Sequence, residues 1–237
     1  MDREKLIAYS FYYGGEYDKV YRAVKADMPI KGRDDPSAVT ILDESYPKCF
    51  FDLKYPPFVF YYAGDLSLLK KDCIGIVGSR KACDYALKAT KGLSLHYSDK
   101  IIVSGLAKGI DAAAHEKQGP AIGVLGCGIQ RIYPYCNKSL IERLKREGLV
   151  ISEYPEYTPP LAHHFPFRNR LIAALSKTLY IMQSNAASGT MTSVNEALEL
   201  GKEIRVLPYD IFEEAGYHNN TLIYEGATPI QRQEIAF

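Results

Sequence analysis

The residues in this sequence that are best suited to chemistry are glycines, serines and cations in short loops after apolar runs. The clearest loop lies at residues 104–109, between an apolar run at 101–103 and an alanine-rich run that starts at 110. This pattern predicts a strand, a glycine loop and the start of a helix. Backbone N–H groups and the positive end of the helix dipole face outward at such a junction, which favours an anionic phosphate. The candidate binding residues of this loop are Ser104, Gly105, Lys108 and Gly109.

Two further loops have the same composition. One follows an apolar run at 73–77, and the other follows an apolar run at 178–182. Small residues let a ligand approach the backbone, hydroxyl and N–H groups donate hydrogen bonds, and cations neutralise phosphate charge. Each loop alone is a weak signal, because glycine is common at strand ends simply as a turn residue. The candidate residues are Gly78, Ser79 and Arg80 in the first loop, and Ser188, Gly189 and Thr190 in the second.

Aromatic and basic residues occur together in a fourth segment, at 163–170. A proline at 166 suits the first turn of a helix, and cations placed there oppose the helix dipole, which indicates a compensating anion. The predicted ligand contacts are Phe165, Arg168, Asn169 and Arg170, with phosphates on the arginines and a base on an aromatic face. The alternative is that the aromatic rings are core and that the arginines form salt bridges with Glu153 or Glu156.

Histidines and carboxylates give weaker signals. The pair His163 and His164 has no acidic or cysteine partner at a matching spacing, so surface or supporting histidines are favoured over a metal site, and no metal is predicted. Asp111 and His115 are four residues apart and could share a helix face, but Asp111 is more simply a helix cap at the end of the glycine loop.

Several nucleotide-binding classes are disfavoured by the spacing of these residues. No Gly-x-x-x-x-Gly-Lys-Ser/Thr run is present, which disfavours a P-loop ATPase. Neither Gly105 and Gly109 nor Gly126 and Gly128 belong to a Gly-x-Gly-x-x-Gly pattern, so a dinucleotide-dependent dehydrogenase is poorly supported.

The composition is that of an ordinary globular protein. Hydrophobic residues make up 47% of the 237 residues and charged residues 24%, with a formal net charge of +1. A nucleic-acid-binding surface must therefore be a local basic patch. No apolar run approaches the roughly 20 residues of a membrane span, and the first residues lack the apolar core of a signal peptide, so we expect a cytoplasmic protein. The five cysteines include no Cys-x-x-Cys pair and are expected to be reduced.

Apolar and helical segments alternate regularly from residue 73 onward. This order predicts an α/β protein, a Rossmann-like and mostly parallel sheet with helices on both faces and the ligand at the carboxyl ends of the strands. We place the boundary of this domain at residue 37, after a short helical region at 1–36 whose tyrosines either pack on the main domain or, less simply, stack on bases. The predicted strands are 73–77, 101–103, 121–125, 149–151, 178–182 and 203–207, and the predicted helices lie near 82–97, 110–118, 137–147, 167–176 and 190–201. Residues 39–42 are expected to form a short strand, and residues 58–62 an extended lead-in.

Taken together, the motifs resemble those of the DNA-processing protein A family, also called DprA or Smf, over roughly residues 40–230. They agree in order and spacing, so they are jointly specific although each is weak alone. The sequence stops at Phe237, so we expect a short form without the winged-helix-like domain that many members carry at the C-terminus. The motifs are Gly78-Ser-Arg80, Ser104-Gly-Leu-Ala-Lys-Gly-Ile-Asp111, Gly126-Cys-Gly-Ile129, Ser152-Glu-Tyr-Pro155, Phe165-Pro-Phe-Arg-Asn-Arg170, Ser188-Gly-Thr190 and Leu222-Ile-Tyr-Glu-Gly-Ala227.

The resemblance implies a single-stranded DNA-binding protein and no enzyme. Members of the family protect incoming strands during natural transformation and recombination, load the RecA recombinase onto them and usually act as homodimers. No cofactor is implied. The loop at 78–80, the loop at 105–109 and the helix start at 165–170 would form the DNA-binding pocket, and the dimer-forming region would include Leu222, Ile223 and Ile230.

An enzyme of the same general fold is the alternative. The sequence is also similar to nucleotide-binding proteins and nucleoside-monophosphate phosphoribohydrolases with a Gly-Gly-x-Gly-Thr-x-x-Glu signature. Here Ser193 occupies the place of that glutamate, and the nearest carboxylate is Glu196. One helical turn displaces a carboxyl group by about 5 Å, which is too far for general acid–base chemistry at the same point.

Overall fold

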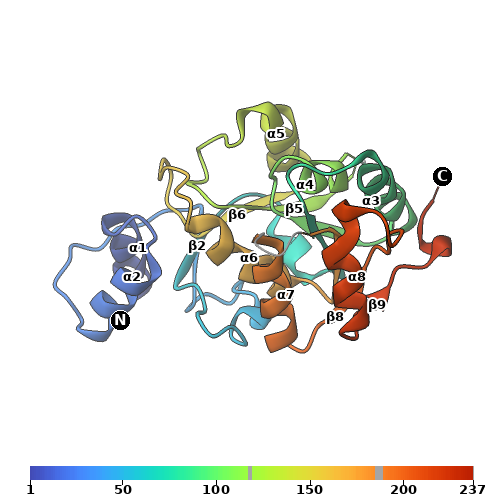
Figure 1. Ribbon diagram of the computed structural model, residues 1–237. Coiled ribbons are helices and arrows are strands. Elements are labelled where there is room, and N and C mark those ends of the chain that lie inside the picture. Colours follow the sequence, from blue (N-terminus) through green and yellow to red (C-terminus); the bar gives the residue numbers. More distant parts are fainter. Residues whose placement is uncertain (117–118, 185–188, 237) are drawn as a thin grey trace.

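One mixed sheet of nine strands organises the chain (Figure 1), in the order β1-β2-β6-β5-β4-β3-β7-β8-β9. The computed structural model describes residues 1–116, 119–184 and 189–236. In this order, all neighbouring strands from β6 across the sheet to β9 are parallel to each other. Strand β2 is antiparallel to both of its neighbours, β6 and β1. The strands are β1 Ala38–Thr40, β2 Val59–Gly64, β3 Cys73–Gly78, β4 Ile101–Ser104, β5 Ala121–Leu125, β6 Leu149–Ser152, β7 Thr178–Gln183, β8 Glu203–Val206 and β9 Thr228–Pro229.

Helices cover both faces of this sheet, as predicted. Figure 1 shows α3, α4 and α5 on one side and α6, α7 and α8 on the other, with α1 and α2 at one end. The fold is therefore the Rossmann-like α/β arrangement that the alternating segments predicted. The helices are α1 Arg3–Tyr12, α2 Tyr17–Lys25, α3 Asp84–His96, α4 Ile110–Ala114, α5 Lys138–Glu147, α6 His164–Leu175, α7 Gly189–Glu199 and α8 Tyr217–Tyr224. Short 3-10 turns lie at Lys48–Phe50, Leu66–Lys70, Tyr135–Asn137, Glu214–Gly216 and Arg232–Glu234.

Each inner strand is buried on both faces because successive side chains point in opposite directions. In β7, Leu179 and Ile181 pack with α6 and α7 in one hydrophobic cluster, whereas Tyr180 and Met182 belong to the cluster beneath α3, α4 and α5. This explains why the inner strands read as continuous apolar runs rather than as alternating ones. Two hydrophobic cores, one on each face of the sheet, therefore fix the positions of the strand ends.

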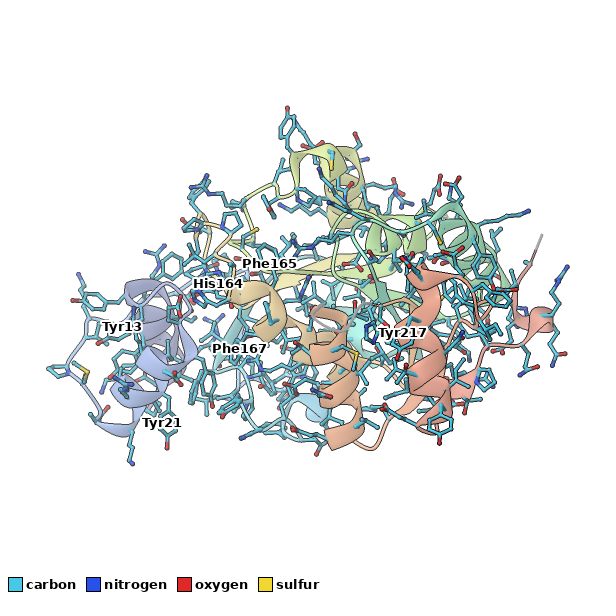
Figure 2. All side chains as sticks on the ribbon, viewed as in Figure 1. Tyr13, Tyr21, His164, Phe165, Phe167 and Tyr217 are labelled. Carbon is cyan, nitrogen blue, oxygen red and sulfur yellow. The ribbon has the colours of Figure 1, made fainter. Side chains whose placement is uncertain are left out.

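The N-terminal helices pack against this sheet through aromatic side chains. Gly14 and Gly15, both with positive φ, make the turn between α1 and α2. The ring of Tyr17 stacks on Phe58 at 5.5 Å and lies 5.8 Å from Phe167. The packing interpretation of the N-terminal tyrosines is thus confirmed for Tyr17, and Figure 2 shows these helices beside Phe167.

Differences from the predicted elements occur mainly at the ends. Helix α6 begins three residues earlier than predicted, so Pro166 lies inside its first turn. The segment expected as an extended lead-in is the strand β2, which pairs with β6 over four residue pairs. Residues 117–118 of the helix predicted at 110–118 lie outside the described residues, and α4 ends at Ala114.

A buried histidine follows α4 and gives the fold a dependence on pH. His115 is 1% exposed, and burial together with the charge of Arg143 lowers its pKa to about 3. In the unfolded chain His115 binds a proton with the ordinary histidine pKa of about 6.5. The free energy of unfolding is therefore unaffected by this group above that pH, and it declines as the pH falls towards 3.

We therefore expect His115 to reduce the free energy of unfolding by about 3 kcal/mol between pH 7.5 and pH 4.5. Urea unfolding of the native protein and of a His115→Gln variant at the two pH values measures this contribution. The other titrating groups are common to both proteins, so the native protein should lose more stability than the variant. An equal loss in both proteins would contradict the assignment.

Candidate functional site

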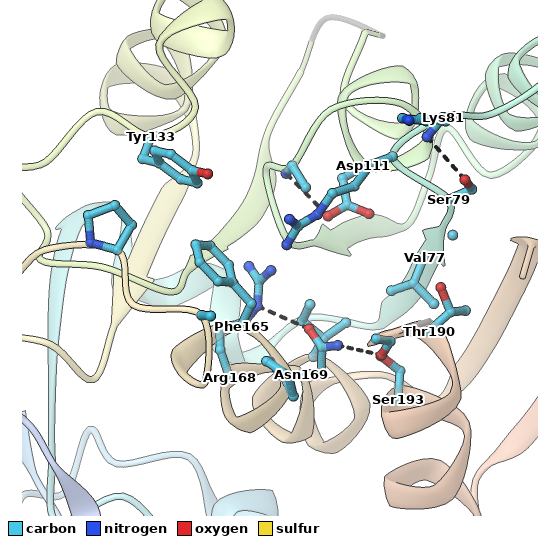
Figure 3. A pocket seen from close by; sticks show the side chains of 18 residues that line it. Val77, Ser79, Lys81, Asp111, Tyr133, Phe165, Arg168, Asn169, Thr190 and Ser193 are labelled. Carbon is cyan, nitrogen blue, oxygen red and sulfur yellow. Dashed lines mark hydrogen bonds between the residues drawn. The ribbon is translucent and has the colours of Figure 1, made fainter. Parts of the chain in front are cut away.

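A cleft of about 610 Å³ lies at the carboxyl end of β3, beside the first turns of α6 and α7 (Figure 3). The chain proceeds from β3 towards β6 on one side and from β7 towards β9 on the other, so the strand order reverses between β3 and β7. Ligands of doubly wound sheets bind at such a point. The lining residues are Val77, Gly78, Ser79, Arg80, Lys81, Ala107, Asp111, Tyr133, Pro160, Ala162, Phe165, Pro166, Arg168, Asn169, Ile172, Gly189, Thr190 and Ser193.

The turn after β3 forms one wall of the cleft. A Cβ atom on Gly78 would lie 2.7 Å from the Ile110 side chain, so only glycine lets β3 approach α4 this closely. The N–H of Ser79 donates to the carbonyl of Gln183 at 2.8 Å, and its Oγ accepts from the N–H of Lys81 at 3.0 Å. These bonds fix the turn from which the two cations project.

Arg80 is one of two exposed cations on this wall. Its guanidinium lies 5.0 Å from the centroid of the Phe165 ring, within the range of a cation–π contact. No carboxylate among the described residues forms an ion pair with Arg80. The charge is therefore free to meet an anion that enters the cleft.

Phe165 and Tyr133 form an aromatic surface opposite Arg80. Their ring centroids are 5.6 Å apart, with planes inclined by 43°. Gly126 makes room for this arrangement, because a Cβ atom there would lie 2.8 Å from the Phe165 ring. Phe165 is only partly buried, so the surface can be contacted by another planar group.

Arg168 lies at the floor of the cleft rather than at its mouth. Its side chain is buried and donates to the carbonyl of Gly105 at 2.6 Å and to that of Val124. Asp111 lies close to Arg168: a Cβ atom placed on Gly105 would be 2.5 Å from both side chains. Burial raises the pKa of Asp111, against the charge of Arg168 and the hydrogen bond from the N–H of Ala107. Arg168 thus holds the floor together and is not a free phosphate ligand.

The first turn of α7 forms the wall across from β3. Asn169 accepts a hydrogen bond from Arg168 and donates through Nδ2 to the carbonyl of Gly189 at 2.8 Å. Thr190 and Ser193 place hydroxyl groups on the cleft, and the Ser193 Oγ has no hydrogen-bond partner among the described residues. Hydroxyls beside the N-terminal end of a helix suit an anionic ligand. Ser188, predicted for the same wall, lies outside the described residues.

Arg170 does not belong to the cleft, which corrects the prediction that it contacts nucleic acid. The residue is 1% exposed and forms two hydrogen bonds to the Glu153 carboxylate, at 2.5 and 2.6 Å. Its guanidinium also lies 3.8 Å from the centroid of the Phe167 ring. The alternative interpretation, a salt bridge to Glu153, is confirmed for this arginine.

The loop at 104–109 supports the cleft from behind, and its four predicted contacts do not line it. Ser104 is buried and donates to the carbonyl of Ile76 at 2.6 Å, while Lys108 is exposed outside the cleft. Gly109 has a φ of +73°, and a Cβ atom there would lie 2.3 Å from the carbonyl of Ser79. The loop at 104–109, which was predicted to contact the ligand, therefore supports the turn at Ser79 instead.

Sequence reasoning missed several lining residues. Lys81 directly follows Arg80, so a count of cations in this loop would have found it. Tyr133 and Ser193 have no such signal, because the turn and the helix that bring them to the cleft are distant in sequence from β3. Only the folded chain places them together.

The predicted dimer residues are mostly part of the core. Leu222 and Ile230 are 7% and 5% exposed and pack in the two hydrophobic clusters, while Ile223 is partly buried against one of them. Leu222 and Ile230 therefore have little surface to offer a partner, and their prediction is corrected. On α8 the exposed side chains include those of Tyr217, labelled in Figure 2, and Tyr224.

Comparisons with known proteins agree with the resemblance of the motifs. A family model described as DNA recombination-mediator protein A matches residues 37–236. A DNA processing protein DprA of Bacillus subtilis is 35% identical over 208 residues, covering 85% of this chain and 70% of its own. None of the helices in the described residues is both long enough and apolar enough to span a membrane.

Two solved structures share the fold. DNA processing protein A from Streptococcus pneumoniae superposes with a TM-score of 0.78 at 29% identity, over 99% of this chain and 94% of that one. The same protein from Helicobacter pylori, described for its single-stranded DNA binding mode, gives 0.74 at 34% identity, over 81% and 90%. None of these relatives is named as an enzyme.

Proposed function

Because the chain belongs to the DNA recombination-mediator protein A family, which acts in DNA processing, we propose that it binds single-stranded DNA in the cleft between β3, α6 and α7. The observation that carries the proposal is Arg80, an exposed cation without an ion pair among the described residues, next to the Phe165 ring. A cation beside an aromatic face suits a nucleotide, which has a charged phosphate and a planar base. The relative from Helicobacter pylori is described as binding single-stranded DNA.

In this proposal, different walls of the cleft contact different parts of the nucleotide. Arg80 and Lys81 contact phosphates, and the hydroxyl of Thr190 donates a hydrogen bond at the start of α7. A base stacks on Phe165, which contributes about 1–3 kcal/mol per base.

The finer role that we propose follows the family. The protein protects incoming strands during natural transformation and promotes loading of the RecA recombinase, as a homodimer. Residues 37–237 form the DNA-binding domain, and residues 1–36 form the helical region that packs beside it. The exposed face of α8, rather than Leu222 and Ile230, is where a partner copy would bind.

A phosphoribohydrolase has weaker support. Asp111 is the one carboxylate among the described lining residues, and it lies against Arg168 and the N–H of Ala107. Glu196 is not among the lining residues. Release of free base from nucleoside monophosphates would be the result that favours this enzyme.

The test is the affinity of Arg80→Ala for labelled oligothymidylate at low salt. We expect a loss of about tenfold or more, and a salt dependence whose log–log slope falls by about 0.7 for each phosphate contact removed. Arg146→Ala is the matched control, because Arg146 is an exposed arginine on α5 that does not line the cleft. Absence of binding by the native protein, or equal affinity of the two variants, would reject the proposal.

A further inference from the structure

A cluster of metal-binding side chains lies outside the cleft, where α2 meets α6. Glu16 precedes α2, His163 precedes α6, and His164 is the first residue of α6. The Nε2 atoms of His163 and His164 lie 3.1 and 3.0 Å from the same carboxylate oxygen, Oε1 of Glu16. One donor atom from each residue falls within 4.8 Å of the others. Three donors therefore converge although Glu16 and His163 are 147 residues apart.

The packing around these side chains holds them in place. His164 is fully buried, and its ring stacks on Tyr154 at 3.8 Å with planes inclined by 17°. Gly15 has a φ of +77°, and a Cβ atom there would lie 2.6 Å from the carbonyl of Glu153, so only glycine brings Glu16 this close to the sheet. Figure 2 shows His164 at the junction with the N-terminal helices. Packing thus fixes the position of the His164 ring and of the backbone at Glu16.

We propose that Glu16, His163 and His164 bind one Zn²⁺ ion, with a water molecule as the fourth ligand. Two imidazoles and one carboxylate are a donor set that zinc takes in proteins. In a tetrahedral site with metal–ligand distances of about 2.0–2.1 Å, neighbouring donors are about 3.3 Å apart. The two nitrogen–oxygen distances in the cluster, 3.0 and 3.1 Å, are close to this edge length.

The placement of the site gives it a structural role. Glu16 belongs to the N-terminal helical region, whereas the two histidines lie at the start of α6. A bound ion joins these two parts of the chain, and it stabilises the folded state because the unfolded chain does not bring the ligands together. His163 and His164 do not line the DNA cleft, so this site is separate from it.

The test uses the full chain, stripped of metal with a chelator and titrated with Zn²⁺ by calorimetry. We expect one equivalent to bind, with an affinity that falls more than about tenfold in both His163→Ala and Glu16→Gln, since loss of even an outer-shell partner costs about 10–100-fold. His163 is 62% exposed, so its replacement should not disturb folding. His96→Ala, an exposed histidine on α3, is the matched control and should bind like the native protein.

Two further measurements separate this site from binding by the five free cysteines. X-ray absorption at the zinc edge should show nitrogen and oxygen at about 2.0–2.1 Å and no sulfur near 2.3 Å. Zinc should also raise the melting temperature of the native and His96→Ala proteins but not that of His163→Ala. No binding at micromolar zinc, a sulfur shell, or unchanged affinity in His163→Ala and Glu16→Gln would each overturn the proposal.

Discussion

Replacing Arg170 with alanine should lower the free energy of unfolding by about 3–5 kcal/mol, the range found when one partner of a buried ion pair is removed. The variant would leave the Glu153 carboxylate, which is 5% exposed, without its partner. It would also remove the donor to the carbonyl of Tyr55 and the cation that lies against Phe167. The size of the effect follows from burial, because charges exposed to water would be solvated instead.

Urea unfolding of three variants measures this effect and its cause. Arg170→Ala should lose the most stability, while the double variant Arg170→Met with Glu153→Leu should recover much of it, since an apolar pair leaves no charge buried. Lys138→Ala is the surface control, because its pair with Glu142 is about half exposed and contributes roughly 0.5 kcal/mol or less. A loss below 1 kcal/mol in Arg170→Ala would show that the pair does not hold this junction.

Arg168→Ala should lose both stability and DNA affinity, in contrast to Arg80→Ala, which should lose affinity alone. Truncation leaves the carbonyls of Gly105 and Val124 without this donor and removes the positive charge beside buried Asp111. We expect a cost of about 3 kcal/mol or more, from a lost charged hydrogen-bond donor and an isolated buried carboxyl group. Weaker binding then comes from a disturbed floor of the cleft rather than from a missing phosphate contact.

Melting curves and oligothymidylate titrations on the same protein preparations distinguish the two arginines. The melting temperature of Arg80→Ala should stay near that of the native protein, because Arg80 is exposed and has no ion pair among the described residues. The salt dependence of binding should fall in Arg80→Ala and remain closer to native in any folded fraction of Arg168→Ala. A native melting temperature in Arg168→Ala would contradict the structural role assigned to this residue.

The alternation of apolar and helical segments was sufficient to predict the fold. Runs such as 121–125 and 178–182 are apolar on both sides because β5 and β7 are covered by helices on each face, and that pattern is specific to inner parallel strands. The lead-in at 58–62 was harder to assign. It forms a strand by pairing with β6, about 90 residues further along, and its own composition carries no signal of that partner.

The place of the site in the fold was predicted more successfully than the individual residues that line it. Gly78, Ser79 and Arg80 line the cleft, because the turn after β3 lies at the carboxyl edge of the sheet, where ligands of such sheets bind. The loop at 104–109 has the same composition but is covered by the turn of Ser79, and only packing decides which of two adjacent loops lies in front. The two arginines at 168 and 170 have different roles because they point to different sides of α6, and Glu153, the partner of Arg170, comes from the end of β6.

The position of β3 in the interior of the sheet also constrains how the protein is made. β3 pairs with β4 soon after it in the chain, but its other neighbour is β7, which begins about 100 residues later. During synthesis from the N-terminus, one edge of β3 remains unpaired until residue 183 has left the ribosome, a state in which exposed strand edges promote aggregation. The cleft spans the boundary between β3 and β7 and is completed by α7 Gly189–Glu199, so a nascent chain becomes competent to bind only after these elements have been made.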